Sequence, residues 1–170
     1  MSQNNLKNPF CCFGFLIFVC LAVVSCDIFP TVAVWLRKVD FEVDPNANNG
    51  NAFVCHIAVA YSKDLYDKLQ GMDAKGYFSS VAALEKTYKD SIEIFKYDMI
   101  PGRNKLNQSI SLSSYTRAKG AFLFAKYLTP GKFMENVGSA RSLTVRFLPY
   151  KMETHSDISF DALRQKLNLE

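Results

Sequence analysis

Histidine is scarce in this chain: of 170 residues only 2 are histidines, His56 and His155. The sequence also contains no HExxH, no CxxC pair, no GxSxG and no phosphate-cradling glycine loop. These absences remove the usual signatures of zinc hydrolysis, thiol redox chemistry, serine hydrolysis and nucleotide binding. His56 falls in a strand pattern and is expected to be packed, whereas His155 is expected to be solvated. The sequence therefore predicts neither an enzyme nor a cofactor.

A concentrated basic surface is also missing. The formal net charge is +4, and the lysines and arginines are scattered rather than gathered in a stripe, which argues against nucleic acid as a partner. One segment imitates a calcium loop, Asp44-x-Asn46-x-Asn48. An EF-hand needs glycine at its sixth position and glutamate at its twelfth, and here those residues are Asn49 and Cys55. We therefore predict no metal site.

The N-terminus carries the clearest signal. Lys7 precedes an uncharged apolar run from Phe10 to Val24, and Val23-Val24-Ser25 leads into Cys26. This order of charge, apolar core and small residues is that of a secretory signal, and the last four residues resemble the lipobox of bacterial lipoproteins. Cleavage before Cys26, with lipid such as palmitate attached there, is the favoured interpretation. The alternatives are an uncleaved membrane helix, although about 15 residues is short for one, and ordinary soluble export.

Cysteine content agrees with export. After cleavage Cys55 is the one free thiol, so the mature chain forms no internal disulfide, and its apolar strand predicts burial. The predicted organisation is a signal peptide over residues 1–25, a lipid-anchored tether over 26–30, a domain over 31–153 and a C-terminal tail with a short helix over 154–170. That helix would place Phe160, Leu163 and Leu167 on one side.

Hydrophobic alternation predicts a mainly β domain. Expected strands cover residues 32–43, 53–61, 92–99, 106–112, 121–128 and 143–147. The first changes parity at Arg37-Lys38, which indicates a β-bulge, and the second is apolar on both faces, as in the centre of a sheet. Residues 62–89 favour helix, interrupted near Gly71 and Gly76. The pattern predicts an antiparallel β-sandwich with a helical insertion.

The order of short motifs resembles that of TssJ, the lipoprotein family of the type VI secretion membrane complex. The motifs are the lipobox, Asp44-Pro45-Asn46 with Gly50, Ala60-Tyr61-Ser62-Lys63, a helical segment with Phe78, Leu84 and Tyr88, Ile100-Pro101-Gly102, and Gly120 to Ala125. The resemblance covers roughly residues 32–147. The segment 130–140 and the tail after Tyr150 have no matching family element.

The resemblance implies a transthyretin-like β-sandwich without catalysis, anchored in the outer membrane on its periplasmic face. It implies docking on the periplasmic domain of TssM, an inner-membrane protein, through the loop between the first two strands. That loop contributes Asp44, Pro45, Asn46, Asn48, Asn49 and Asn51. A plain solvent loop is the alternative interpretation, since turns of this composition are common. Asp27 resembles an inner-membrane retention signal, so an inner-membrane location stays open.

Two further functions remain as alternatives: a periplasmic lipoprotein that binds a small ligand or client protein, and a lipoprotein of another secretion system. A scaffold predicts a filled core and an exposed loop tip. A ligand binder predicts a sizeable apolar cavity, and an enzyme predicts a cleft with convergent polar side chains.

Overall fold

The computed structural model describes residues 34–103, 106–114 and 117–156. The chain separates into Met1–Pro30 and Thr31–Glu170, and the second unit contains a continuous hydrophobic core. Because a unit with its own core is the usual requirement for independent folding, we expect Thr31–Glu170 to fold by itself. Within the described ranges, no helix is both long and apolar enough to cross a bilayer.

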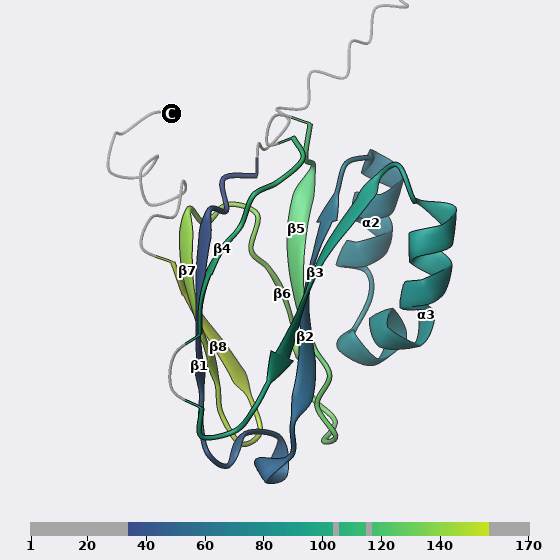
Figure 1. Ribbon diagram of the computed structural model, residues 1–170. Coiled ribbons are helices and arrows are strands. Elements are labelled where there is room, and N and C mark those ends of the chain that lie inside the picture. The colour runs from purple at the N-terminus through teal and green to yellow at the C-terminus, as the bar shows by residue number, and fades with distance from the viewer. Residues whose placement is uncertain (1–33, 104–105, 115–116, 157–170) are drawn as a thin grey trace, which may run out of the picture. The chain divides into compact units, whose positions relative to one another are not determined.

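Two four-stranded sheets face each other (Figure 1), with strand orders β4-β1-β7-β8 and β3-β2-β5-β6. Their strands are β1 (Lys38–Val43), β2 (Phe53–Ala60), β3 (Ile92–Met99), β4 (Leu106–Ser109), β5 (Gly120–Ala125), β6 (Met134–Asn136), β7 (Ser142–Phe147) and β8 (Met152–Ser156). The predicted mainly β sandwich is confirmed. One detail differs from the antiparallel expectation: β1 and β7 pair in parallel, from Lys38 opposite Ser142 to Val43 opposite Phe147.

The strand β2 lies in the centre of its sheet, between β3 and β5. Every residue from Cys55 to Ala60 is buried, because one face of the strand meets the opposite sheet and the other meets the helices. The central position predicted from the two apolar faces is therefore confirmed. Cys55 is fully buried, and that burial raises the pKa of its thiol far above its usual range. The thiol thus stays protonated and packs as a small apolar group.

Two helices cover the outer face of the β2 sheet, as Figure 1 shows. They are α2 (Lys63–Gln70), capped by the Ser62 side chain, and α3 (Ala74–Thr87), capped by Asp73, whose Oδ1 accepts from the Gly76 amide at 2.6 Å. The insertion is confirmed with its break at Gly71. Gly76 does not interrupt it, because it lies in the first turn of α3, where the aspartate cap holds its amide.

The first strand begins later than the pattern predicts. Val34 and Leu36 are buried, but they precede β1, which starts at Lys38. Arg37 and Lys38 are exposed in succession, and Val39 and Phe41 are then buried. The predicted change of parity is confirmed by this burial pattern.

Two strands, β6 and β8, lie in segments for which the sequence pattern predicts no strand. β6 has only 3 residues, and β8 is an edge strand of mostly polar residues, METHS. The last strand runs to Ser156, across the predicted domain end at residue 153. The predicted tail helix with Phe160, Leu163 and Leu167 lies outside the described residues.

Candidate partner-binding site

The loop Asp44–Asn51 joins β1 to β2 at one end of the sandwich (Figure 1). Its tip is a short 3-10 segment, η2 (Ala47–Gly50), in which Asn48, Asn49 and Gly50 have φ angles of 51°, 57° and 75°. Asparagine and glycine are the residues that adopt this left-handed conformation at least cost. The Asn-Asn-Gly sequence therefore encodes a defined loop shape.

Hydrogen bonds within the loop hold that shape. The Asn46 amide donates to Asp44 Oδ1 at 2.7 Å, and the Asn51 amide donates to the Asn48 carbonyl at 3.1 Å. The Asn51 side chain donates to the Asn49 carbonyl at 3.2 Å. A loop ordered in this way before binding loses little conformational entropy when a partner docks.

Asn48 connects the loop to the rest of the sandwich. Its side chain is buried, with 1% of its surface exposed. Its Nδ2 donates to the Asn51 carbonyl at 3.1 Å, and its Oδ1 accepts from the Leu128 amide, beyond β5, at 2.6 Å. Asn48, one of the residues predicted to contact the partner, is therefore not an exposed contact residue. This side chain is a structural support.

The other predicted site residues lie at the surface. Pro45, Asn46, Asn49 and Asn51 are exposed, and Asp44 is half-buried. The structure thus brings the predicted residues together, as consecutive loop residues must be, and it exposes Asn46 and Asn49 at the loop. These two are the polar groups most suited to contact another protein.

Three large apolar side chains lie at the same end of the sandwich. Ile100, Leu128 and Tyr150 are 44%, 70% and 72% exposed, and they follow β3, follow β5 and lie between β7 and β8, respectively. We call these three residues, together with the loop Asp44–Asn51, the loop face. The sequence pattern did not indicate the apolar members, although each is beside or near a proline, a residue typical of exposed turns.

An aromatic cluster packs next to the loop face and supports it. The rings of Tyr127 and Phe133 stack with centroids 4.0 Å apart, and Phe53 contacts both Tyr127, at 4.8 Å, and Phe147, at 5.1 Å. The Tyr127 hydroxyl donates to the Leu148 carbonyl at 2.9 Å, which links the β5–β6 connection to the β7–β8 hairpin. Burial raises the pKa of Tyr127 well above its usual range. Packed aromatic side chains therefore support the loop face.

Two surface cavities bear on the alternative functions. One, of about 570 Å³, lies between the start of α3 and the β5–β6 connection, with Phe78, Leu128 and Phe133 in its wall and Lys75 and Lys126 beside them. Its walls are mainly apolar, as expected of a site that binds a small ligand or a client protein.

The other cavity, of about 360 Å³, is polar and contains Tyr61, Glu93, Ser113 and Arg117. Glu93 accepts hydrogen bonds from the Tyr61 hydroxyl and from the Ser113 hydroxyl, the latter at 3.0 Å. Burial, followed by the hydrogen bond to Glu93, raises the pKa of Tyr61 to about 12. Both hydroxyls donate to one carboxylate, an arrangement that joins β3 to the segment after β4.

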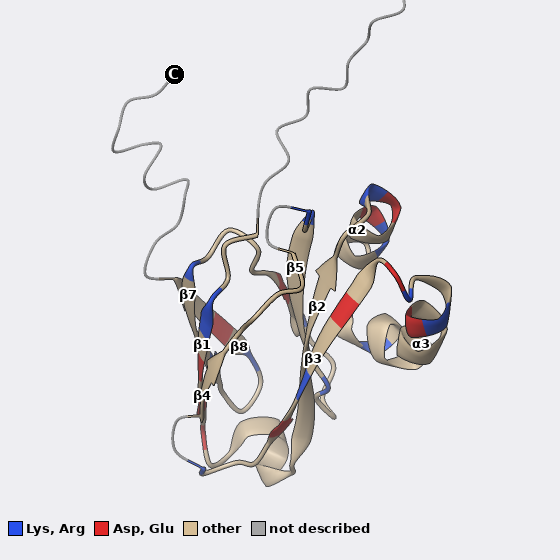
Figure 2. Cartoon of the chain, turned by 45° about the horizontal axis from the view of Figure 1, so that its top comes forward, with Lys and Arg blue, Asp and Glu red and all other residues tan. Residues whose placement is uncertain are grey.

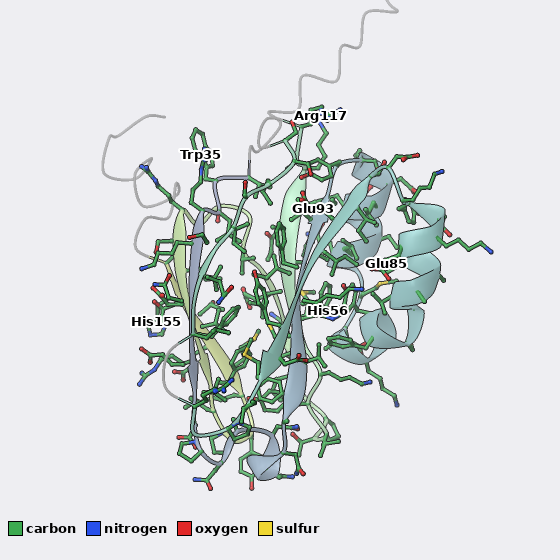
Figure 3. All side chains as sticks on the ribbon, viewed as in Figure 1. Trp35, His56, Glu85, Glu93, Arg117 and His155 are labelled. Carbon is green, nitrogen blue, oxygen red and sulfur yellow. The ribbon has the colours of Figure 1, made fainter. Side chains whose placement is uncertain are left out.

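His56 is packed, as predicted, and points toward α3 (Figure 3). Its Nδ1 lies 3.2 Å from the Tyr77 hydroxyl, and its ring contacts Phe78 with centroids 4.9 Å apart. Burial, and next the charge of Lys96, lower the pKa of His56 from its ordinary value. His155 is exposed. In the described part of the chain, no three histidine, cysteine, aspartate or glutamate side chains gather as metal ligands would.

The lowered pKa of His56 predicts a pH-dependent stability. In the unfolded chain His56 takes up a proton below about pH 6.5, but in the fold it does so only at lower pH. The unfolded state therefore binds more protons as the pH falls through 6.5, and the free energy of unfolding decreases toward acid. Urea denaturation at about pH 7.5 and about pH 5 should show a smaller acid loss in His56→Gln than in the unsubstituted domain. Equal losses in both proteins would contradict the assignment.

The similarity of this chain to known proteins lies in its fold. No protein-family model matches the sequence, and no curated protein matches it significantly. The architecture is a two-sheet β-sandwich with a helical insertion. It is similar to Lip from Serratia marcescens, a membrane-bound component of the type VI secretion system, with 11% identity, a TM-score of 0.52 and coverage of 72% of this chain and 97% of that chain.

A second similar structure is the type VI secretion lipoprotein TssJ1 from Pseudomonas aeruginosa, with 13% identity and a TM-score of 0.52. The match covers 72% of this chain and 95% of that chain. The resemblance to TssJ read from the sequence motifs is confirmed as a shared fold. Cys26, the predicted lipid attachment site, lies outside the described residues.

Proposed function

We propose that this chain is a lipid-anchored scaffold protein of a type VI-like secretion membrane complex, which docks through its loop face on the periplasmic domain of a TssM-type inner-membrane protein. The observation that carries the proposal is the fold it shares with two type VI secretion lipoproteins. The proposed role requires no catalysis and no cofactor. It requires an anchor, a rigid body and a binding surface.

The position of the loop face suits a connector. The described chain begins at Val34, at the end of the sandwich opposite the loop Asp44–Asn51 (Figure 1). Strand β2 alone has 8 residues, and at about 3.3 Å per residue the sandwich separates its two ends by about 25 Å. A lipid at Cys26 would therefore leave the loop face on the far side of the domain, where a partner can reach it.

The chemistry of the loop face suits a protein partner. It combines the exposed amides of Asn46 and Asn49 with the exposed apolar side chains of Ile100, Leu128 and Tyr150. Apolar and aromatic anchors surrounded by polar groups are the usual composition of protein interfaces. The purified domain, residues 31–170, is expected to bind the periplasmic part of the TssM-type protein encoded in the same genome. A lack of binding in a titration would reject the proposed function.

Membrane attachment is proposed through Cys26, on the periplasmic face of the outer membrane, with the inner membrane as the alternative because of Asp27. Replacing Cys26 by serine should abolish labelling by radioactive palmitate and release the protein from the membrane fraction, because two or more acyl chains are needed for stable anchoring. Cys55→Ser is the matched control, since that thiol is buried. Persistent labelling of Cys26→Ser would contradict lipidation at this residue.

One observation favours a second function, binding of a small ligand or client. It is the cavity of about 570 Å³ beside α3. Ser79→Trp, at the cavity lining, should leave binding of the TssM-type protein unchanged if the chain is a scaffold. The same substitution should weaken binding of the small ligand or client if the function of the chain is to bind it in this cavity. A lipoprotein of another secretion system would share the anchor and the sandwich but bind a different partner in the titration.

A further inference from the structure

The single tryptophan of the chain, Trp35, lies at the end of the sandwich opposite the loop face (Figure 3). Its side chain is 47% exposed, and its backbone amide donates to the Gly138 carbonyl at 3.1 Å. The position of the residue is therefore set by the fold, while nearly half of a large amphipathic ring meets solvent. The loop face carries Tyr150 as its exposed aromatic residue, so the two ends can be compared within one protein.

Three arginines lie at the same end of the sandwich as Trp35. The Arg37 amide donates to the Arg141 carbonyl at 2.9 Å, so these two residues are neighbours, and both side chains are exposed. Arg117 is exposed at the same end (Figure 3). Figure 2 shows basic segments at the ends of β1 and β7 and beside β5. We call Trp35, Arg37, Arg117 and Arg141 the tether face.

Acidic groups also line the polar cavity near this face. Glu93, which lines the same cavity as Arg117, accepts from the Tyr61 and Ser113 hydroxyls. Lys89 and Asp90 in that cavity contribute one charge of each sign. Among the residues that the structure describes, Arg37 and Arg141 lie near Trp35 and are exposed and positive, which favours an anionic surface as the partner of this face.

The length of the tether limits how far this face can lie from a membrane. Val34 follows Cys26 by eight positions in the sequence, which span at most about 28 Å when fully extended. Lipid at Cys26 would therefore hold Trp35 within about 28 Å of the attachment point, a distance from which its ring can reach the headgroup layer. Tryptophan is enriched in that layer because its ring is apolar and its indole N–H is polar. Arginine matches phosphate through paired N–H donors.

We propose that the tether face lies on the membrane, with the Trp35 ring in the headgroup layer and Arg37 and Arg141 on the phosphates of anionic lipids. This inference depends on the proposed function only through the anchor at Cys26. The contact has a direct consequence for that function: it orients the sandwich upright, so that the loop face is presented away from the bilayer instead of adopting every direction that a free tether allows.

The test uses Trp35 as its own fluorescent probe. Residues 31–170 with an N-terminal histidine tag are bound to phosphatidylethanolamine–phosphatidylglycerol vesicles that contain a nickel-chelating lipid, and the acyl chains carry bromine. The tag replaces the native anchor. Trp35 emission should shift to the blue and be quenched by more than about twofold, because bromine quenches only rings that reach the membrane. Arg37→Gln with Arg141→Gln should lower partitioning of the untagged domain to these vesicles by about tenfold.

A matched variant moves the probe to the other end. Trp35→Phe combined with Tyr150→Trp places the only tryptophan on the loop face, where the exposed fraction of the original side chain is 72%. Its emission should be unaffected by brominated lipid. Absence of quenching at Trp35 in the tagged domain, or equal quenching in both proteins, would overturn the proposed orientation. Neither outcome depends on Cys26 or on the TssM-type protein, so failure here is distinct from failure of the proposed function.

Discussion

Replacing Asn46 by alanine and Asn49 by glycine should weaken binding of the domain to the TssM-type periplasmic part by about tenfold or more. Both side chains are exposed on the loop face, and removal of central interface groups typically costs about 1 to 2 kcal/mol each. Glycine is chosen at position 49 because the φ angle there is 57°, a conformation in which alanine is strained. The loop should therefore keep its shape while losing two amides.

A titration by calorimetry measures this effect. The control is Gln70→Ala with Ser111→Ala, which removes an exposed amide and an exposed hydroxyl outside the loop face, and it should bind as the unsubstituted domain does. Leu128→Ser tests the apolar part of the same surface. Undiminished affinity of the Asn46→Ala/Asn49→Gly protein would reject the loop as the contact while leaving the fold and the lipid anchor standing.

Asn48→Ala should destabilise the domain by about 3 kcal/mol, far more than any other substitution of a loop asparagine. The change removes two part-buried hydrogen bonds, from the Leu128 amide and to the Asn51 carbonyl, which are worth about 1 kcal/mol each. It also places alanine at a φ angle of 51°, which costs about 1 to 2 kcal/mol more. Binding assays of this variant would therefore report loss of structure, which is why it is unsuitable for mapping the interface.

Urea denaturation measures the change in free energy of unfolding. Asn49→Gly is the matched control, because it alters the adjacent exposed residue without strain and should stay within about 0.5 kcal/mol of the unsubstituted domain. Asn48→Asp should be intermediate, since it retains an acceptor for the Leu128 amide but loses the Nδ2 donor to the Asn51 carbonyl. A loss below about 0.5 kcal/mol in Asn48→Ala would show that this side chain is no support.

The local pattern of apolar and polar residues was sufficient to predict much of the fold. The strand β2 was recognisable because apolar residues fill both of its faces, and the break between α2 and α3 was marked by Gly71. Strands β6 and β8 were not recognisable. The first is three residues long, and the second is half-buried at a sheet edge, so neither carries the alternation on which sequence-based assignment depends. The parallel pairing of β1 with β7 joins residues about a hundred positions apart, which no local pattern encodes.

The candidate site likewise has features that the sequence predicts and features that only the tertiary structure determines. The predicted export signal and the predicted lipidation motif at Cys26 are read from consecutive residues, because processing enzymes recognise a linear segment. The turn chemistry of Asn48-Asn49-Gly50 is likewise local. The association of Leu128 with Asn48, the grouping of Ile100, Leu128 and Tyr150 on one face, and the place of Trp35 at the opposite end are decided by tertiary structure. They depend on strands from both sheets ending at the same edge, a relation that exists only once the chain has packed.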